Sequence, residues 1–242
     1  MDFNSMPTAC LEQILIHGAN EHVSATCKAL RQAWISVVQQ PALVAKHIYL
    51  CFGPDALSNL HRCAAARVCH ATGKTEQLLQ ELDRLQPFTE TSIGAAISAC
   101  VEADTGSLLQ LLVPKSPQYK CRKALFLAVK LNKLSAAKAI AITDPNADLD
   151  YALLDAFIDG SVEMAELLIS LGGSPWIHNG MGLFSVVKEG SLEKLKAFLR
   201  VKMPDIPDPA ETFNLHESLQ RAISKKQTEK EDLMRHYLQR WL

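Results

Sequence analysis

The chain repeats one pattern of apolar residues about every 30 positions, and this repeat restricts the folds that the chain can adopt. Each copy opens with a leading apolar residue, and the spacings between successive leading residues are 28, 28, 30 and 36. The leading residues are Ile97, Leu125, Leu153, Leu183 and Leu219. Because one short helix pair cannot bury its own apolar face, a fixed period of this length predicts helix pairs that stack on one another.

Three further columns stay aligned with the leading residue in all five copies. The first column lies three positions after the leading residue and holds a pair of small or apolar residues: Cys100-Val101, Ala128-Val129, Ala156-Phe157, Val186-Val187 and Ala222-Ile223. A turn position follows, held by Asp104, Asn132, Gly160, Gly190 and Lys226. Seven positions after the turn comes a second pair: Leu111-Leu112, Ala139-Ile140, Leu167-Leu168, Ala197-Phe198 and Leu233-Met234. Each copy is therefore predicted to be two short amphipathic helices joined by a tight turn, with a weaker copy at 65–82.

The composition favours an all-α protein and excludes several functional classes. The chain is 48% hydrophobic but only 6% aromatic, which suits helices packed through small aliphatic side chains. A net charge of −1 supplies no field that would attract nucleic acid or an anionic membrane. No apolar run reaches the 18 or so residues that a membrane span needs, and no basic, then apolar, secretion signal opens the sequence.

Cysteine usage points to a reducing compartment. The chain has seven cysteines, an odd number, and they are scattered through the helical pattern rather than clustered. Scattered cysteines in apolar positions are typical of reduced, buried thiols. We therefore expect a cytoplasmic or nuclear protein.

The repeat resembles the ankyrin repeat, a unit of about 33 residues with a β-turn and two antiparallel helices. Asp144-Pro145-Asn146-Ala147 reproduces the family's loop, and Lys188-Glu189-Gly190 resembles its turn. The family's Thr-Pro-Leu-His-x-Ala opening keeps only its Leu and its small residue, as at Leu153 and Ala156. The resemblance covers roughly residues 65–242 and implies an all-α, ankyrin-type helical-repeat solenoid that binds a protein partner.

Residues 5–40 are different in kind and resemble an F-box, a small helical domain. The positions that match the family pattern are Pro7, Leu11, Ile14, Leu15, Cys27, Lys28 and Arg31, and Met6 is a conservative departure. The resemblance implies docking onto the Skp-type subunit of a cullin ubiquitin ligase. The apolar contact would be made by Met6, Pro7, Leu11, Ile14 and Leu15. The alternative is a plain helical cap, since the ends of a solenoid need a polar outer face.

We therefore expect three parts along the chain. An F-box-like helical segment at 1–40 is followed by a helical connector at 41–60 and a divergent ankyrin-type repeat array at 61–242.

Motifs that resemble sites of phosphate or metal chemistry are incomplete. The stretch Thr72-Gly73-Lys74-Thr75 ends like a phosphate-binding loop, but Val68 stands where that motif requires its first glycine. His61, Cys63, Cys69 and His70 resemble zinc ligands. On one helix, however, Cys63 and Cys69 would lie about 9 Å apart along the axis, and zinc holds its ligands at about 2.0–2.3 Å.

An acidic run resembles a calcium loop. Asp144, Asn146, Asp148, Asp150 and Asp155 fall at the spacing of ligands in an EF-hand. Leu149 occupies the position that must be glycine for the sharp turn, so the run is better explained as a repeat loop. With no catalytic constellation elsewhere, we expect a binding protein rather than an enzyme, with no metal and no cofactor.

The loops between repeats carry the strongest binding signal. They supply Asn146, Asp148, Trp176, His178 and Asn179. Tryptophan is enriched in interface hot spots and is seldom exposed without a role. Two interpretations stay open for Trp176: it contacts a partner, or it folds back onto Leu171 or Met181 and closes the loop.

Two functional hypotheses follow from these features. The first is a substrate adaptor of a Skp–cullin–F-box ubiquitin ligase, with a target protein held by the repeats. The second is an interaction scaffold with no link to a ligase, in which the N-terminal helices only cap the array. In either case we expect a monomer apart from its partners.

Overall fold

The computed structural model describes residues 28–116, 118–174, 182, 185–188, 191–200, 217, 220 and 228–239. Within these residues every regular element is a helix, and no strand occurs, so the predicted all-α class is confirmed. The chain divides into two compact units, Met1–Pro117 and Gln118–Leu242.

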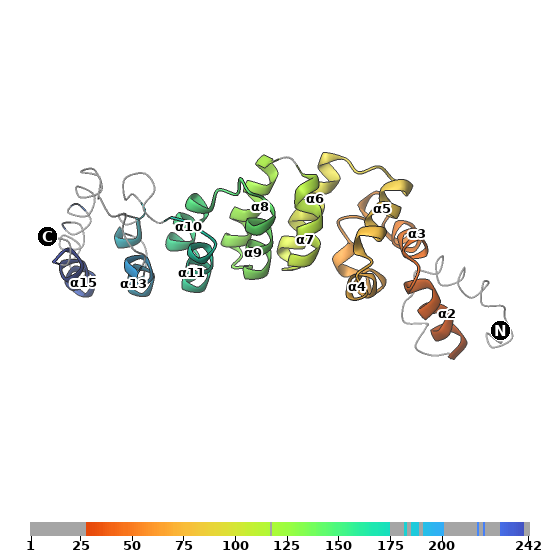
Figure 1. The fold of residues 1–242 in the computed structure, drawn as a ribbon, viewed down its shortest axis with the longest axis horizontal. Helices are drawn as coiled ribbons and strands as arrows, with labels where there is room; N and C mark the ends of the chain where they lie inside the picture. The colour runs from red at the N-terminus through yellow and green to blue at the C-terminus, as the bar shows by residue number, and fades with distance from the viewer. Residues whose placement is uncertain are drawn as a thin grey trace. The chain divides into compact units, whose positions relative to one another are not determined.

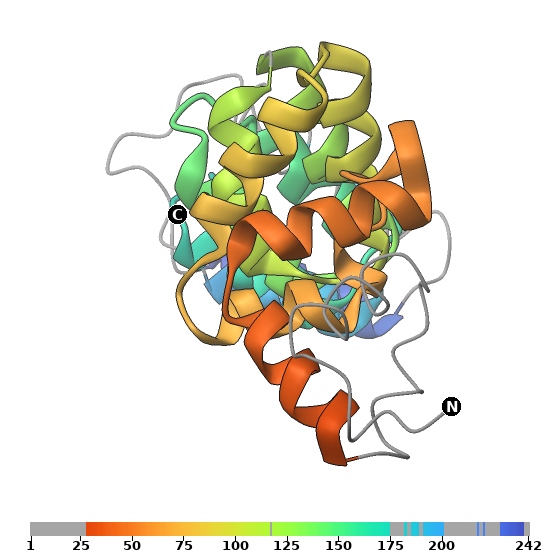
Figure 2. The same cartoon turned by 90° about the vertical axis from the view of Figure 1, so that its right-hand side faces the viewer.

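Unit 1 is built on the packing of α3 (Pro41–Phe52) against α5 (Thr75–Leu85), which is its most extensive helix interface. The helix α2 (Lys28–Val38) contacts α3 and meets it at a steep angle, as Figure 2 shows. An edge-to-face contact between Trp34 and the buried His47, with ring centroids 5.5 Å apart, joins these two helices. The remaining helices are η3 (Gly53–Asp55), η4 (Leu60–Arg62), α4 (Ala64–Ala71), α6 (Glu90–Glu102), α7 (Gly106–Leu112) and η5 (Val113–Lys115).

Unit 2 is a succession of helix pairs. Its described helices are α8 (Gln118–Lys130), α9 (Leu134–Thr143), α10 (Leu149–Ile158), α11 (Val162–Ser170), α13 (Leu192–Arg200) and α15 (Thr228–Leu238). In Figure 1, α8 and α10 form one row, while α9, α11, α13 and α15 form a second. The rings of Phe157 on α10 and Phe198 on α13 lie 5.1 Å apart between their centroids, so one pair packs on the next through aromatic contact.

The core includes the leading residue and the pair three positions after it wherever these are described, whereas Leu111, Leu167 and Leu233 of the second pair are only half-buried. The leading residues Ile97, Leu125 and Leu153 are buried, as the register predicts. In the column three positions on, Cys100, Ala128, Ala156 and Val186 are all buried as well. These small side chains lie between helices and allow the helices to approach closely.

Four of the described helices end in the same kind of turn. The turn residues Gly73, Asp104, Asn132 and Gly172 follow α4, α6, α8 and α11, and each has a positive φ, of 71°, 54°, 53° and 104°. The next amide donates a hydrogen bond to the carbonyl five residues back: Lys74 to Cys69, Thr105 to Cys100, Lys133 to Ala128 and Gly173 to Leu168. This left-handed cap satisfies carbonyl groups that a helix end leaves unpaired.

Gly160 occupies the turn position of its own copy, but glycine is needed there for a different reason. Its φ lies outside the left-handed region, and a Cβ built there would lie 2.8 Å from the Cα of Ala156. Glycine is required at this position because the chain passes close to the end of α10. Ser161 then caps α11 by accepting the amide hydrogen of Met164, and its hydroxyl donates to Asn132 in the preceding turn at 2.7 Å.

Candidate functional site

Most of the predicted binding residues lie outside the described residues. This holds for the whole F-box-like contact, Met6, Pro7, Leu11, Ile14 and Leu15, and for Trp176, His178 and Asn179 in the second loop. Asn146 and Asp148, in the loop between α9 and α10, are described. They show how one repeat loop is built.

Asp148 is fixed by two interactions in this loop. Its carboxylate caps α10 by accepting the backbone N–H of Tyr151 at 3.3 Å. It also forms an ion pair with Arg122 of α8, with 2.9 Å between the charged atoms. A side-chain oxygen at the helix start satisfies a backbone N–H that would otherwise be unpaired. Asn146 is exposed at the tip of the loop, and its N–H donates to Asp144.

The ion pair places Arg122 over two aromatic rings. The guanidinium carbon lies 5.3 Å from the ring centroid of Tyr151 and 5.7 Å from that of Phe126. These distances are within the range of cation–π attraction. The Arg122 side chain is 51% exposed and Tyr151 is 37% exposed, so the group faces solvent. We call Arg122, Phe126, Asp148 and Tyr151 the arginine–aromatic cluster.

Sequence reasoning identified Asp148 in this cluster and missed the other members. Arg122 and Phe126 are four positions apart on α8 and so share one face of that helix. Tyr151 is the third residue of α10, which places it beside its own cap. Both signals are local and could have been read from the sequence. The meeting of the two helices could not.

The second repeat loop leaves α11 from a fixed starting point. Gly172 has a φ of 104°, and the N–H of Gly173 donates to the carbonyl of Leu168. The N–H of Ser174 then donates to the carboxylate of Asp150 on α10 at 2.7 Å. The start of the second loop is therefore bonded to α10, the helix that follows the first loop.

The described members of the acidic run do not converge on one point, and the zinc-like residues differ in burial. Asp144, Asp148 and Asp150 accept backbone hydrogen bonds from three different positions rather than facing one common point. Cys63 and Cys69 are buried in unit 1, whereas His70 is exposed. In the described part of the chain no three His, Cys, Asp or Glu side chains gather as metal ligands.

The buried thiols of unit 1 are poor nucleophiles. Burial raises the pKa of Cys69, and the nearby Lys74 opposes this only in part. Burial likewise raises the pKa of Cys100, against a smaller effect of the hydrogen bond with Thr105. A raised pKa lowers the fraction of reactive thiolate at neutral pH.

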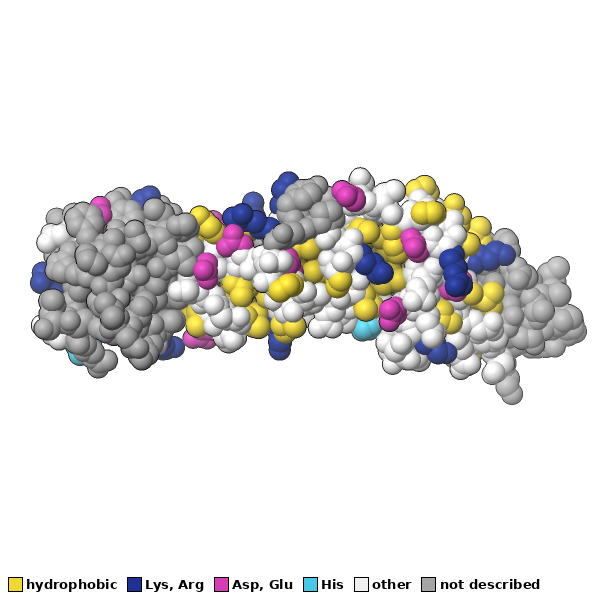
Figure 3. Space-filling model, turned by 45° about the horizontal axis from the view of Figure 1, so that its top comes forward, with side chains coloured by type: hydrophobic (Ala, Val, Ile, Leu, Met, Phe, Trp, Pro, Cys, Tyr) yellow, Lys and Arg dark blue, Asp and Glu magenta, His cyan; other side chains and the backbone are white. Residues whose placement is uncertain are grey.

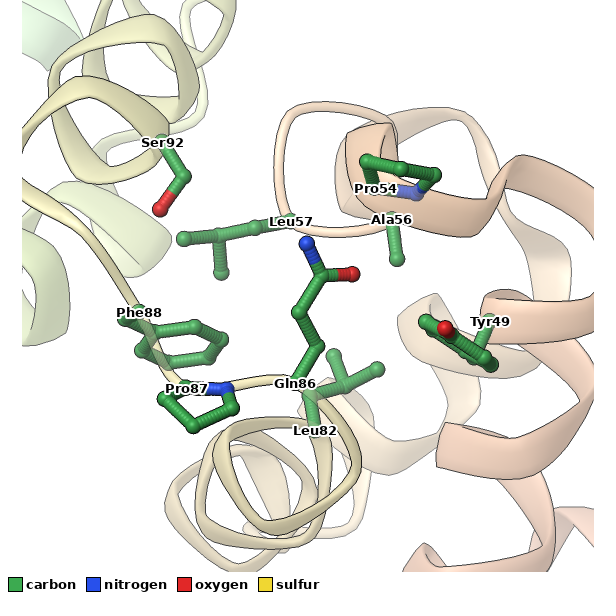
Figure 4. A pocket seen from close by; sticks show the side chains of 9 residues that line it. All are labelled: Tyr49, Pro54, Ala56, Leu57, Leu82, Gln86, Pro87, Phe88 and Ser92. Carbon is green, nitrogen blue, oxygen red and sulfur yellow. The ribbon is translucent and has the colours of Figure 1, made fainter.

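A hollow on unit 1 is lined almost entirely by apolar and aromatic residues. Its free volume is only about 10 Å³, and it is formed by Tyr49, Pro54, Ala56, Leu57, Leu82, Gln86, Pro87, Phe88 and Ser92. Figure 4 shows Tyr49 and Phe88 on opposite sides, with the carboxamide of Gln86 pointing between Leu57 and Pro54. Apart from the Tyr49 phenol, no ionisable group lines the hollow.

The described surface carries mixed charge. Figure 3 shows Lys and Arg side chains close to Asp and Glu, with hydrophobic side chains between them and no broad field of one sign in this view. Among the described helices, none combines the length and the apolar character that crossing a membrane requires.

Comparison with known proteins adds no relative. A scan of protein-family models and searches of curated proteins and of solved structures find no match to this chain. The likenesses to the ankyrin repeat and to the F-box therefore rest on the residues quoted for them.

Proposed function

We propose that this chain is a substrate adaptor of a Skp–cullin–F-box ubiquitin ligase. Its ankyrin-type repeats hold a target protein, and its N-terminal segment docks onto the Skp-type subunit. Residues 1–40 carry the second half of this proposal through their resemblance to the F-box. The repeats carry the first half through their periodicity and their loops.

The arginine–aromatic cluster is the observation that most favours a protein partner. Arginine and tyrosine are enriched in interface hot spots because each combines a broad apolar surface with hydrogen-bonding groups. Here the ion pair with Asp148 and the ring of Phe126 hold Arg122 in place before any partner arrives. A side chain ordered in advance loses less conformational entropy on binding, so more of the contact energy appears as affinity.

The loops of unit 2 extend this surface. The hydrogen bond from Ser174 to Asp150 brings the start of the second loop beside α10, where Tyr151 also lies. That second loop contains Trp176, His178 and Asn179. We infer one continuous contact surface that runs from Asn146 and the arginine–aromatic cluster to these three residues.

Docking to a Skp-type subunit is tested with a double variant, Leu11→Asp with Leu15→Asp. If both leucines form the apolar contact, the two charges abolish the pull-down of a Skp-type protein, because a carboxylate buried without a partner is strongly unfavourable. Helical circular dichroism should stay close to that of the wild type, since repeats contact only their neighbours.

Two results would redirect this proposal. Global unfolding of the double variant would place Leu11 and Leu15 in a structural cap. Failure of the wild-type chain to bind any Skp-type protein would leave the scaffold function, with no ligase link.

Target binding is tested at the cluster and in the second loop. Tyr151→Ala and Trp176→Ala should each weaken binding of a target recovered with the wild-type chain by about 2 kcal/mol, the usual hot-spot threshold. Titration calorimetry measures this loss, and the binding of the Skp-type protein should not change.

A third variant, Arg122→Ala, should also weaken target binding, and Arg84→Ala is its matched control. Both arginines are exposed and ion-paired, Arg84 with Glu81 at 2.6 Å, but Arg84 has no place in the proposed surface. Loss of affinity in Arg122→Ala alone supports the surface. Equal affinities for the wild type, Tyr151→Ala and Trp176→Ala would move the contact away from the loops.

A further inference from the structure

A second and larger pocket lies within unit 1, between η4, α4, α5 and the start of α7. It holds about 70 Å³ of free volume, several times what one water molecule needs. Its lining consists of Leu60, His61, Ala66, Arg67, His70, Thr75, Leu78, Thr105, Ser107 and Leu108. We call it the His61 pocket. It shares no residue with the hollow around Gln86 and contains none of the residues of the proposed partner surface.

The walls of the His61 pocket are apolar. Leu60, Leu78 and Leu108 come from three different helices, and all three are buried. Ala66 is also buried and leaves space where a larger side chain would fill the pocket. Such walls bind an apolar body by removing it from water, at roughly 25 cal/mol for each Å².

Two hydroxyl groups of the pocket have partners within the protein. The Thr75 hydroxyl lies 3.1 Å from Nδ1 of His70, and the Thr105 hydroxyl donates to the carbonyl of Cys100. By contrast, Nδ1 of His61 is buried and makes no hydrogen bond within the described part of the chain. A buried polar atom without a partner is unfavourable, so a ligand that supplies the partner gains affinity.

The charged and titratable side chains that line the pocket indicate which kind of ligand it binds. The lining includes Arg67 and two histidines, His61 and His70, and no acidic side chain. Arg67 is exposed and also lines the pocket, so its side chain lies where the pocket meets solvent. A guanidinium matches the two oxygens of a carboxylate, and an imidazole can donate a further hydrogen bond.

We propose that the His61 pocket binds a small amphipathic carboxylic acid. The apolar body of the ligand lies among Leu60, Leu78 and Leu108, and Arg67 and His61 bind its carboxylate. This site goes beyond the proposed adaptor function and does not depend on it.

Three probes separate the two parts of this recognition. The full chain, labelled with ¹⁵N, is titrated with hexanoate, with 1-hexanol and with acetate, and amide shifts are followed by NMR. Hexanoate supplies both the apolar body and the charge, whereas each of the other two supplies only one. Saturable shifts of amides at 60–78 and 105–108 are expected with hexanoate, and affinities at least about tenfold weaker are expected with the other two probes, because a charge-assisted contact or the burial of several CH₂ groups is lost.

A pair of neighbouring arginines provides the matched variants. Arg67→Gln should weaken hexanoate binding about tenfold, whereas Arg62→Gln should leave it unchanged, because Arg62 is exposed beside His61 but does not line the pocket. Both positions are exposed, so neither variant should unfold the chain.

Three outcomes would overturn the proposal. They are the absence of saturable shifts with hexanoate, equal affinity for hexanoate and 1-hexanol, and an equal effect of the two arginine variants. None of them affects the adaptor proposal, which is tested with proteins at other surfaces.

Discussion

At the scale of single residues, the turn position of the repeat selects its residue for one physical reason in some copies and for another reason in others. Asp104 and Asn132 adopt the left-handed conformation that usually selects glycine, and short polar side chains tolerate this region better than most. Gly160 has no such φ, but its missing Cβ makes room for the backbone of α10. Aligned positions in a divergent repeat can therefore respond differently to the same substitution.

Substitutions at the two turns should show this difference. Asp104→Gly and Asp104→Ala both remove the carboxylate, and the alanine variant should be less stable by about 1 kcal/mol because φ is positive there. Gly160→Ala should cost about 1–3 kcal/mol through the contact with Ala156. Urea unfolding followed by circular dichroism measures all three. Equal stability of the two Asp104 variants would contradict the left-handed turn.

At the scale of elements, several helices begin at side-chain caps and pack through a column of small residues. Helix α6 begins at a capping box between Thr89 and Ser92, while Asp148 caps α10 and Ser161 caps α11. Each of these three helix starts thus has a side-chain acceptor of its own, whereas α7 and α9 begin without one. Packing then depends on the column of small residues, and Ala156 is fully buried in it.

Overpacking tests this column. Ala156→Leu adds three carbon atoms between packed helices and should cost about 1–3 kcal/mol. Ala95→Leu on α6 is the control, because Ala95 is exposed and a leucine there meets solvent. Thermal unfolding of the two variants should separate them clearly. An unchanged melting temperature in Ala156→Leu would count against the repeat register.

At the scale of the whole molecule, the described cysteines report on burial in both units. Cys51 is partly exposed, whereas Cys63, Cys69, Cys100 and Cys121 are buried, and none of the five is in a disulfide. The raised pKa of Cys69 and of Cys100 further lowers their thiolate fraction.

Alkylation of the cysteines in the native protein should follow their exposure and their thiolate fraction. Iodoacetamide at neutral pH is expected to modify Cys51 first among these five residues and Cys69 and Cys100 last, because reaction needs an accessible thiolate. Peptide mass spectrometry gives the rate at each site, and urea should make the rates similar. Reaction of Cys69 or Cys100 as fast as Cys51 in native buffer would show that the core of unit 1 opens readily.

Periodicity alone determined the all-α class and the buried columns of the described helices. Leu125, Leu153 and Ala156 could be assigned to the core because a helix with a period of 3.6 residues places such positions on one face. The loops could also be located, since Pro145 and Gly173 interrupt that period. These properties depend on interactions over a few residues, and the local sequence contains them.

Only the tertiary structure decided which side chains meet. Arg122 reaches Asp148 and Tyr151 because α8 and α10 pack side by side, and the His61 pocket forms because η4, α4, α5 and α7 converge. Residues 41–60, expected as a helical connector, contain α3, and its packing along α5 is visible only in the structure. Such contacts depend on the distance and angle between helices, which are set by the fit of many side chains at once rather than by any local pattern.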